Sequence, residues 1–288
     1  MRLTRIAAVA LSAALAFGMA ACGGDDDGGD ASTKFAAGTT MEKLAKAGKL
    51  KIGTKFDQPL FGLKGLDGKP AGFDVEIGKI LAKELGIDAD KIEWVESTSK
   101  VREDYIQQDK VDLVVATYTI NATRKEKVSF AGPYFVAGQD ILVRKDDTSI
   151  SGPESFRAGD KKVCSVTGST PAKNIEQYLK DKNTQLVLFD VYSKCLDALK
   201  AKQVDALTTD NVILAGYQSK EPDAVKVLGQ PFTREPYGIG VKKDDKVFRD
   251  WINDVLVAAF ADGRYKAAWD ASIGTLIAVP TSLNVERY

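Results

Sequence analysis

The sequence predicts an α/β protein with two lobes that are built alike, and three observations lead to this fold class. The chain has 288 residues, which is enough for two domains of ordinary size. Short apolar runs rich in β-branched residues alternate with stretches of helical periodicity, as in sheets that are covered by helices. A module of helix, short polar break, Val-Asp, apolar strand and polar exit occurs twice, at 110–117 and at 203–210.

The composition excludes several classes of function. Lysine plus arginine equals aspartate plus glutamate, 40 against 40, so no net charge favours binding to nucleic acid or to an acidic membrane surface. The chain has no histidine, which rules out Ser-His-Asp or Cys-His catalysis and histidine-ligated metals. Neither a Walker A nor a GxGxxG pattern occurs, so we expect no cofactor and no metal site.

The first 40 residues have the pattern of an export segment and a tether. Arg2 and Arg5 precede an apolar run at 6–21 that is too short to span a membrane comfortably, so we expect a signal peptide at 1–21. The run ends in Met-Ala-Ala-Cys, which is typical of a lipobox and predicts lipidation of Cys22. Ordinary cleavage, with Cys22 incidental, is the alternative. The glycine- and aspartate-rich stretch that follows predicts a flexible lipidated tether at 22–40.

The first lobe is expected to begin with a strand at 50–54, whose exit loop carries Lys55 at the carboxyl edge of the sheet. In that place the lysine faces either a ligand or solvent. The apolar stripe of 72–85 predicts an amphipathic helix that is stopped by a glycine, with Asp74 and Glu76 as cap and first-turn acids. A strand at 92–95 and a helix at 99–108 follow. Arg102 lies in the first turn of that helix.

The stretch 111–135 is the centre of the prediction. The run 111–116 indicates a strand buried on both faces, and Thr117, Thr119 and Arg124 follow at its carboxyl end. Asn121 is a good N-cap and would place Arg124 in the first turn of a helix, where a cation is unfavourable for stability. A ligand carboxylate held by a forked pair of hydrogen bonds would remove this conflict. The alternative is an ordinary surface ion pair of Arg124 with Glu126 or a neighbouring carboxylate.

The second lobe is expected to contain strands at 162–166 and 185–189. Thr170 as N-cap and Pro171 at the first helical position predict a helix start. The free N–H groups of Gly168, Ser169 and Thr170 would form a second small anion site; the alternative is a cap and nothing more.

Two cysteines and one aspartate complete the second lobe. After export, Cys164 and Cys195 would lie in an oxidising compartment, which favours a disulfide over two buried free thiols. Asp210 occupies the exit of the second module's strand, as Thr117 does in the first. A return strand at 230–241 and helices at 247–261 and 265–269 close the chain. We expect lobe 1 at 41–137 and 235–288, lobe 2 at 138–234, and a hinge of two strands between them.

Several of these segments resemble one family. The run VDLVVATYTINATRKEKVSFAGPYF, the helix GFDVEIGKILAKEL, the Gly-Ser-Thr turn and the Asp-Gly-Arg-Tyr ending at 262–265 are similar to the extracellular amino-acid-binding proteins of ABC importers, solute-binding protein family 3. The resemblance extends from Leu44 to Ile273 and is closest to the glutamate-binding branch. It implies a periplasmic-binding-protein-like fold of type II.

The resemblance also implies a function and a set of binding residues. The protein would be an extracytoplasmic lipoprotein, anchored to the cell membrane, that captures free L-glutamate as a monomer and delivers it to an ABC permease. Aspartate and glutamine are the alternative ligands. A sensor subunit, or an enzyme of the dehydratase or lyase type on the same fold, is the alternative function, but we expect a protein that is not an enzyme. Arg124, Thr119 and the turn of Gly168, Ser169 and Thr170 would hold the α-carboxylate, Asp210 and Thr117 the ammonium, Lys55 and Arg102 the distal carboxylate, and Tyr192 would be a further side-chain contact.

Overall fold

The computed structural model describes residues 34–274 and 276–288. The expected signal peptide, Cys22 and the tether as far as residue 33 lie outside the described residues. Within the described part the chain is packed from its start, since the ring of Phe35 lies edge-on against Trp251 with centroids 6.0 Å apart. The same part contains no helix of the length and apolar character that a membrane crossing needs.

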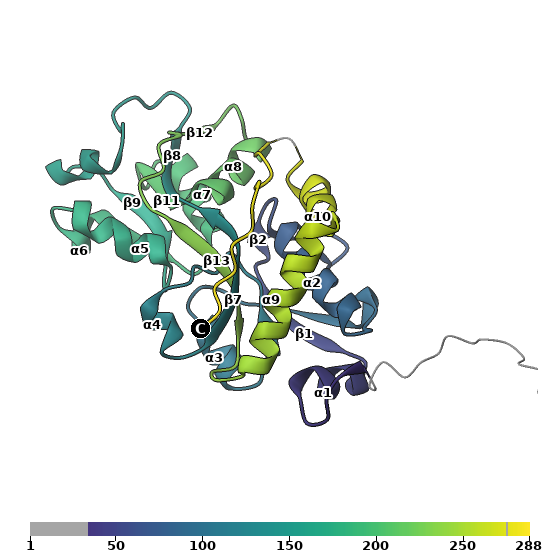
Figure 1. Cartoon of the computed structure of the whole chain (residues 1–288). Helices are drawn as coiled ribbons and strands as arrows, with labels where there is room; N and C mark the ends of the chain where they lie inside the picture. The colour runs from purple at the N-terminus through teal and green to yellow at the C-terminus, as the bar shows by residue number, and fades with distance from the viewer. Residues whose placement is uncertain (1–33, 275) are drawn as a thin grey trace, which may run out of the picture. The chain divides into compact units, whose positions relative to one another are not determined.

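Two five-stranded sheets form the centres of two lobes (Figure 1). The first sheet has the order β5-β1-β6-β13-β7, in which β1, β5 and β6 are parallel and β13 runs antiparallel to its neighbours. Its strands are β1 (Leu50–Thr54), β5 (Ile92–Glu96), β6 (Leu113–Val114), β7 (Ser129–Ala137) and β13 (Glu235–Val241). A separate small sheet consists of β2 (Asp57–Gln58), β3 (Gly62–Lys64) and β4 (Pro70–Ala71). We call the elements around these two sheets the first lobe.

The second sheet has the order β10-β9-β11-β8-β12 and forms the second lobe. Strands β9, β10 and β11 are parallel, whereas β8 is antiparallel to both of its neighbours. Its strands are β8 (Gln139–Arg144), β9 (Val163–Val166), β10 (Leu186–Phe189), β11 (Ala206–Asp210) and β12 (Val225–Val227). The two lobes therefore repeat one arrangement, a parallel core with an antiparallel strand, as the repeated module predicted.

Helices cover both sheets. In the first lobe they are α1 (Thr40–Ala47), α2 (Phe73–Glu84), η2 (Ala89–Lys91), α3 (Arg102–Gln107), α4 (Ala122–Lys125), α9 (Lys246–Ala261) and α10 (Arg264–Ser272). In the second lobe they are η3 (Pro153–Ala158), α5 (Thr170–Ile175), η4 (Glu176–Tyr178), α6 (Lys182–Gln185), α7 (Tyr192–Lys200) and α8 (Asn211–Lys220). Helix α9 packs on β7, and α7 packs on β9.

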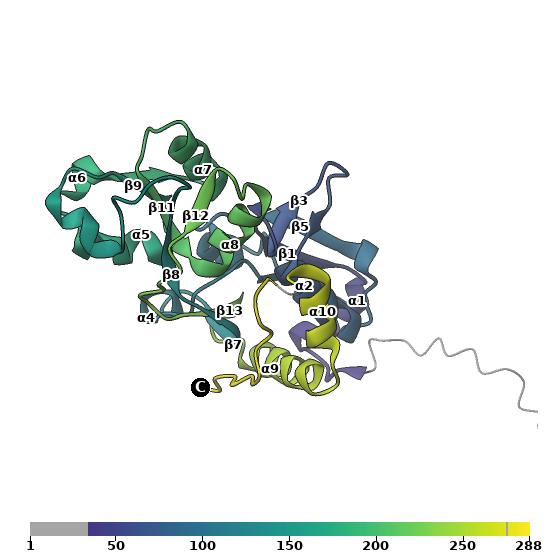
Figure 2. The same ribbon diagram turned by 90° about the horizontal axis from the view of Figure 1, so that it is seen from above.

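The chain passes between the lobes at two neighbouring places (Figure 2). One crossing leads from β7 through Gly138 into β8, and the other leads from β12 into β13. A Cβ atom at Gly138 would lie 2.8 Å from the carbonyl oxygen of Thr233, so only glycine lets the two crossings come this close. The N–H of Gln139 donates to the Thr233 hydroxyl at 2.9 Å, which joins the crossings directly. The protein is thus a two-lobed α/β protein with a two-strand hinge, as predicted.

Helix α10, which begins within the Asp-Gly-Arg-Tyr segment, packs back on the first lobe. The hydroxyl of Tyr265 donates to the backbone carbonyl of Tyr134 at 2.8 Å. The rings of Phe73 and Trp269 meet edge-on with centroids 5.0 Å apart, and both side chains are fully buried. Burial of side chains of this size contributes roughly 1.5 to 3 kcal/mol each.

A disulfide joins Cys164 of β9 to Cys195 of α7, as the oxidising compartment suggested. Both cysteines are fully buried, so the bond fixes α7 against the centre of the second sheet. Two expected strands are shorter in the structure. The run 111–116 forms ladder pairs only at Leu113 and Val114, and the return strand begins at Glu235 instead of residue 230.

Candidate functional site

Arg124 is placed by a capped turn of helix at the rim of the first sheet. Asn121 is the N-cap of α4, and its side chain accepts a hydrogen bond from the Arg124 N–H at 2.9 Å, as predicted. Arg124 is only 6% exposed. Burial, followed by repulsion from Arg102, lowers the pKa of Arg124 to about 10.

The guanidinium of Arg124 reaches across to the second lobe. It donates to the backbone carbonyl of Thr119 at 2.7 Å, to the hydroxyl of Thr170 at 3.0 Å and to the backbone carbonyl of Gly168 at 3.0 Å. It also pairs with Glu103 of α3, with Nε 3.2 Å from Oε1. The ion pair considered as the alternative for Arg124 is therefore present, but its partner is Glu103 and not Glu126, and the pair is largely buried and not on the surface.

Thr117 lies in a left-handed turn that Asp74 holds in place. Its φ of +44° is unusual for a β-branched residue, and such a conformation needs support from its surroundings. The Thr117 N–H donates to Asp74 Oδ2 at 2.7 Å, and the hydroxyl of Tyr134 donates to Asp74 Oδ1 at 2.6 Å. The Thr117 hydroxyl lies 2.9 Å from Oε1 of Gln58.

Asp74 therefore has a role that the sequence did not show. The residue lies in the first turn of α2, but the N-cap is Gly72 and makes no side-chain bond, so Asp74 is not a cap. Its carboxyl is fully buried, and this burial raises its pKa to about 7. Positions 74, 77, 78, 81 and 85 form one face of α2 and all are buried, so a carboxylate within an apolar stripe was the available signal.

Lys55 and Arg102 are two buried cations on the first lobe. Lys55 is 4% exposed and its ammonium donates to the Ser99 hydroxyl at 3.0 Å. Arg102 is 2% exposed, donates to the backbone carbonyl of Ala116 at 2.8 Å, and lies 4.0 Å above the ring centroid of Tyr118. Neither cation forms an ion pair with a carboxylate among residues 34–274 and 276–288. Burial, followed by the positive charge of Arg102, holds the pKa of Lys55 well below its ordinary value.

Asp210 closes β11 on the second lobe and is buried, with 3% exposure. The hydroxyl of Tyr237 donates to Asp210 Oδ2 at 2.6 Å. Burial, followed by the negative charge of Glu235, raises the pKa of Asp210 to about 7. In the described structure, Oδ1 of Asp210 has no hydrogen-bond partner, and the same holds for Nε of Arg102 and Nε2 of Gln58.

The turn at 168–170 differs in detail from the prediction. The N-cap of α5 is Ser169, not Thr170, because the Ser169 hydroxyl accepts from the Ala172 N–H at 3.0 Å and Thr170 is already the first helical residue. The Ser169 N–H donates to the carbonyl of Val166. Gly168 presents its carbonyl, an acceptor, to Arg124, where donors were expected.

Tyr192, at the start of α7, lies beneath this turn. It is 3% exposed, and its hydroxyl lies among the side chains of Ser169 and Ser165. Burial, followed by the charge of Asp210, raises the pKa of Tyr192 to about 12. The side chain is thus part of the second-lobe wall next to Ser169.

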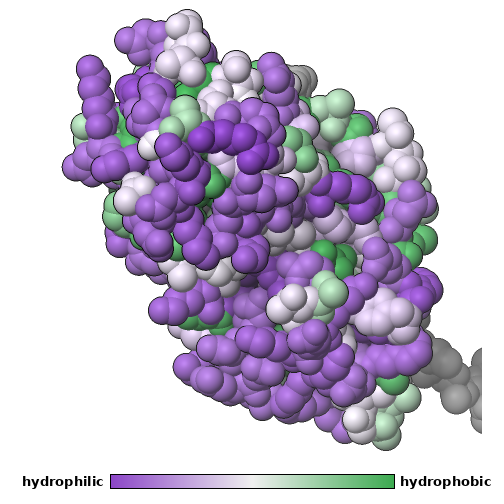
Figure 3. Space-filling view, turned by 90° about the vertical axis from the view of Figure 1, so that its left-hand side faces the viewer, coloured by the Kyte–Doolittle hydropathy of each residue, from purple (hydrophilic) through white to green (hydrophobic). Residues whose placement is uncertain are grey.

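A cavity of about 610 Å³ lies on the side of α4 and α5, and its lining includes Glu103, Arg124, Gly168, Ser169 and Thr170. The lining does not include Lys55, Arg102 or Asp210. The face that carries α4, α5 and α6 is mostly hydrophilic (Figure 3).

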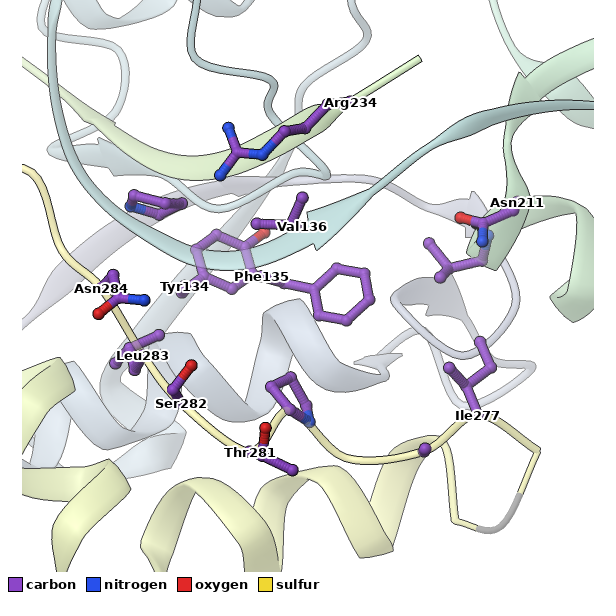
Figure 4. A pocket seen from close by; sticks show the side chains of 14 residues that line it. Tyr134, Phe135, Val136, Asn211, Arg234, Ile277, Thr281, Ser282, Leu283 and Asn284 are labelled. Carbon is purple, nitrogen blue, oxygen red and sulfur yellow. Dashed lines mark hydrogen bonds between the residues drawn. The ribbon is translucent and has the colours of Figure 1, made fainter. Parts of the chain in front are cut away.

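A different cavity, of about 460 Å³, lies between β7 and the C-terminal segment and contains none of the predicted site residues. Figure 4 shows Tyr134 and Phe135 of β7 on one side and Ser282 and Leu283 of the C-terminal segment on the other. We assign it no role in ligand binding.

The structure therefore collects the predicted residues around one interface between the lobes. Lys55, Arg102, Thr117, Thr119 and Arg124 come from the first lobe, and Gly168, Ser169, Thr170, Tyr192 and Asp210 come from the second. The three cations all come from the first lobe. Arg124 donates to Thr170 and Gly168 of the second lobe, and the charges of Arg102 and Arg124 act on Asp210 there. Such an arrangement can bind a small zwitterion by charged hydrogen bonds when the lobes are closed.

Comparisons with known proteins agree with this fold. The sequence profile of the bacterial extracellular solute-binding proteins, family 3, matches residues 50–274. The chain is 41% identical over 281 residues to the glutamate-binding protein GluB of Corynebacterium glutamicum, which covers 94% of this chain and 91% of that protein. It is 43% identical over 220 residues to a glutamine-binding protein of Geobacillus stearothermophilus, covering 76% and 82%. A solved ancestral amino acid-binding protein, AncCDT-1, described as a precursor of cyclohexadienyl dehydratase, matches with a TM-score of 0.74 at 32% identity over 81% of this chain and 99% of its own.

Proposed function

Because the chain belongs to the bacterial extracellular solute-binding proteins of family 3, we propose that it captures free L-glutamate and delivers it to an ABC permease. It would act outside the cytoplasm as a monomer, held at the membrane through lipidated Cys22. The lobe boundaries expected from the sequence, 41–137 with 235–288 and 138–234, are part of this proposal.

The observation that carries the choice of an acidic ligand is the pair of buried cations, Lys55 and Arg102. A buried cation without a carboxylate is unfavourable, and a ligand that supplies one relieves that cost. Arg102 Nε is buried and has no hydrogen-bond partner in the described structure, so it has a donor to offer. The distal carboxylate of glutamate would take this place, whereas the amide of glutamine carries no charge to compensate the cations.

The head group of the amino acid would be held between the lobes. Arg124, the backbone of Thr119 and the turn of Ser169 and Thr170 would bind the α-carboxylate, which would replace the Gly168 carbonyl as the acceptor for the guanidinium. Asp210, whose Oδ1 has no partner in the described structure, and the Thr117 hydroxyl would accept hydrogen bonds from the ammonium. Since both lobes contribute, the ligand would stabilise only the closed form, and this is a signal that a transporter can detect.

The test is a thermal-shift screen of the mature protein against the twenty amino acids, followed by calorimetry of the hits. Glutamate should raise the melting temperature most and bind much more tightly than glutamine. Equal affinity for glutamate and glutamine would contradict the roles of Lys55 and Arg102. It would not affect the residues proposed to bind the α-carboxylate and the ammonium. Glutamine is the second candidate, because the relative from Geobacillus stearothermophilus is a glutamine-binding protein.

We propose that the protein binds its ligand without transforming it. The relatives at 41% and 43% identity are binding proteins, which supports this view, although one structural relative is described as a precursor of a dehydratase. The acids of the site, Asp74 and Asp210, already have holding roles. Incubation with glutamate or glutamine should return the amino acid unchanged, and turnover would favour an enzyme.

A further inference from the structure

Asp57 lies on β2, in the loop that follows β1, and makes no contact with the residues proposed to hold the head group. Its carboxylate crosses to the second lobe and accepts from the backbone N–H of Tyr192 at 2.8 Å and of Ser193 at 3.3 Å. Both N–H groups belong to the first turn of α7. The N-cap of that helix is Val191, which has no side chain that can accept a hydrogen bond. A residue of the first lobe therefore supplies the cap of a helix in the second.

A second contact of the same loop comes from α8. The hydroxyl of Tyr217 lies 2.8 Å from the backbone carbonyl of Asp57 and 3.2 Å from its carboxylate. Tyr217 is 4% exposed, and burial, followed by the charge of Asp57, holds its pKa well above the ordinary value. One residue of the first lobe thus engages two helices of the second.

Gly216 of α8 sets how closely the lobes approach here. A Cβ atom at this position would lie 2.6 Å from the carbonyl oxygen of Pro59, a contact that real Cβ atoms essentially never make. The obstacle is backbone, so a rotamer change cannot relieve it. Alanine is, however, the better residue for the interior of a helix. Glycine at position 216 therefore allows the lobes to close and lowers the intrinsic stability of helix α8.

We propose that Asp57, Pro59, the backbone N–H groups at the start of α7, Gly216 and Tyr217 form a closure latch, which sets the affinity for the ligand through contacts between the lobes that do not include the ligand. The latch rests on the proposed function, because it acts on the closure that traps the amino acid. A helix cap and a hydrogen bond to a charged group both form when the lobes meet, and both are lost when the lobes separate. The latch therefore stabilises the closed form by the same amount for every ligand.

The measurement is calorimetry of glutamate and glutamine with wild type and three variants. Asp57→Ala should weaken both affinities about 10- to 100-fold, since a cap and charged hydrogen bonds are lost together. Tyr217→Phe should weaken both by about 3- to 10-fold, in line with loss of one hydrogen bond. Gly216→Ala should weaken binding by about tenfold or more while the melting temperature of the ligand-free protein stays constant or rises.

The control is Asp190→Ala, which removes an acid just before the same helix. Asp190 pairs with Lys194 within the second lobe and its side chain is 61% exposed, so this change should leave affinity within about twofold of wild type. The ratio of glutamate to glutamine affinity should be the same in Tyr217→Phe, Gly216→Ala and Asp190→Ala as in wild type. Asp57→Ala also removes a negative charge that acts on Lys55, so its ratio is not used as a criterion. A changed ratio in Tyr217→Phe or Gly216→Ala would show that these residues act on the ligand itself, and unchanged affinity in Asp57→Ala or Gly216→Ala would show that no latch exists.

The two proposals fail in different ways. If wild type binds none of the twenty amino acids, the proposed function is wrong, and the latch is then judged from the distance between the lobes alone. Dyes at the exposed positions Glu93 and Lys180 would report this distance by single-molecule fluorescence. Asp57→Ala and Gly216→Ala should show more molecules with a long distance than wild type. Identical distributions would overturn the latch.

Discussion

Replacement of Asp210 by asparagine should change binding and stability in opposite directions. Asparagine has nearly the same shape and can still accept the hydrogen bond from Tyr237, which Asp210 receives at 2.6 Å. The substitution removes only the negative charge that we propose to hold the ligand's ammonium. Loss of one partner of a buried charged pair costs about 2 to 5 kcal/mol, so the affinity for glutamate should fall by about 30- to several-thousand-fold.

The ligand-free variant should be more stable than wild type above pH 7. Burial and Glu235 raise the pKa of Asp210 to about 7 in the folded protein, above the ordinary value of 3.8. The stability that the protonated carboxyl contributes is fully present below pH 4 and is lost as the pH rises through 7. The difference of roughly three pH units corresponds to a loss of about 4 kcal/mol at most, and asparagine does not titrate. Opening of the lobes rehydrates Asp210, so we expect a gain of about 1 to 3 kcal/mol at pH 8 and less than half of that gain at pH 5.

The assay combines calorimetry with urea denaturation of the ligand-free protein at pH 5 and pH 8. Wild type should lose stability between the two values more steeply than Asp210→Asn. Saturating glutamate should restore wild type at pH 8 but not the variant. If Asp210→Asn binds glutamate as tightly as wild type, the ligand's ammonium does not bind to Asp210. If the ligand-free variant is less stable than wild type at pH 8, the electrostatic reasoning is refuted.

Three further predictions follow from the same contacts. Arg124→Ala should lower the affinity for glutamate, measured by calorimetry, by tens- to thousands-fold, whereas Arg124→Lys should retain part of the affinity. Near-unchanged binding by the alanine variant would show that Arg124 does not hold the α-carboxylate. Lys55→Met and Arg102→Met should each narrow the preference for glutamate over glutamine, measured as the ratio of the two dissociation constants, and an unchanged ratio would exclude them from the distal carboxylate site. Cys164→Ser with Cys195→Ser should reduce the free energy of unfolding by about 3 to 4 kcal/mol, and wild type in reductant should match the double variant in urea titrations.

Sequence patterns predicted the features that depend on local chemistry. Asn121 caps α4 because a short polar side chain before a helix satisfies free N–H groups, and this holds in almost any fold. The repeated Val-Asp module indicated two similar lobes, since each buried strand needs the same kind of sheet around it. The position of Asp210 at a strand exit predicted its place at the rim, opposite Arg124.

What could not be predicted depends on contacts between distant segments. Glu103 pairs with Arg124 across 21 positions of sequence, and nothing in an ordinary helical stretch distinguishes this glutamate from its neighbour Asp104. Asp57 looks like a loop residue because its partners lie in the other lobe. The sequence predicts the N-cap of α5 one residue late, at Thr170, because serine and threonine are both good caps and only the backbone conformation distinguishes them.

The closed structure brings together charges that oppose one another until a ligand arrives. Burial keeps the carboxyl of Asp210 from ionising easily and holds the pKa of Lys55 well below its ordinary value. An α-amino acid with an acidic side chain supplies an ammonium for Asp210 and a carboxylate for Lys55, so its binding favours the charged forms of these two residues. Glutamate should therefore bind with release of a proton at Asp210 and uptake of one at Lys55, whereas glutamine should bring about only the release. Calorimetry in buffers of different ionisation enthalpy measures the number of protons exchanged on binding. An equal number for the two amino acids would show that Lys55 does not bind the side chain of the ligand.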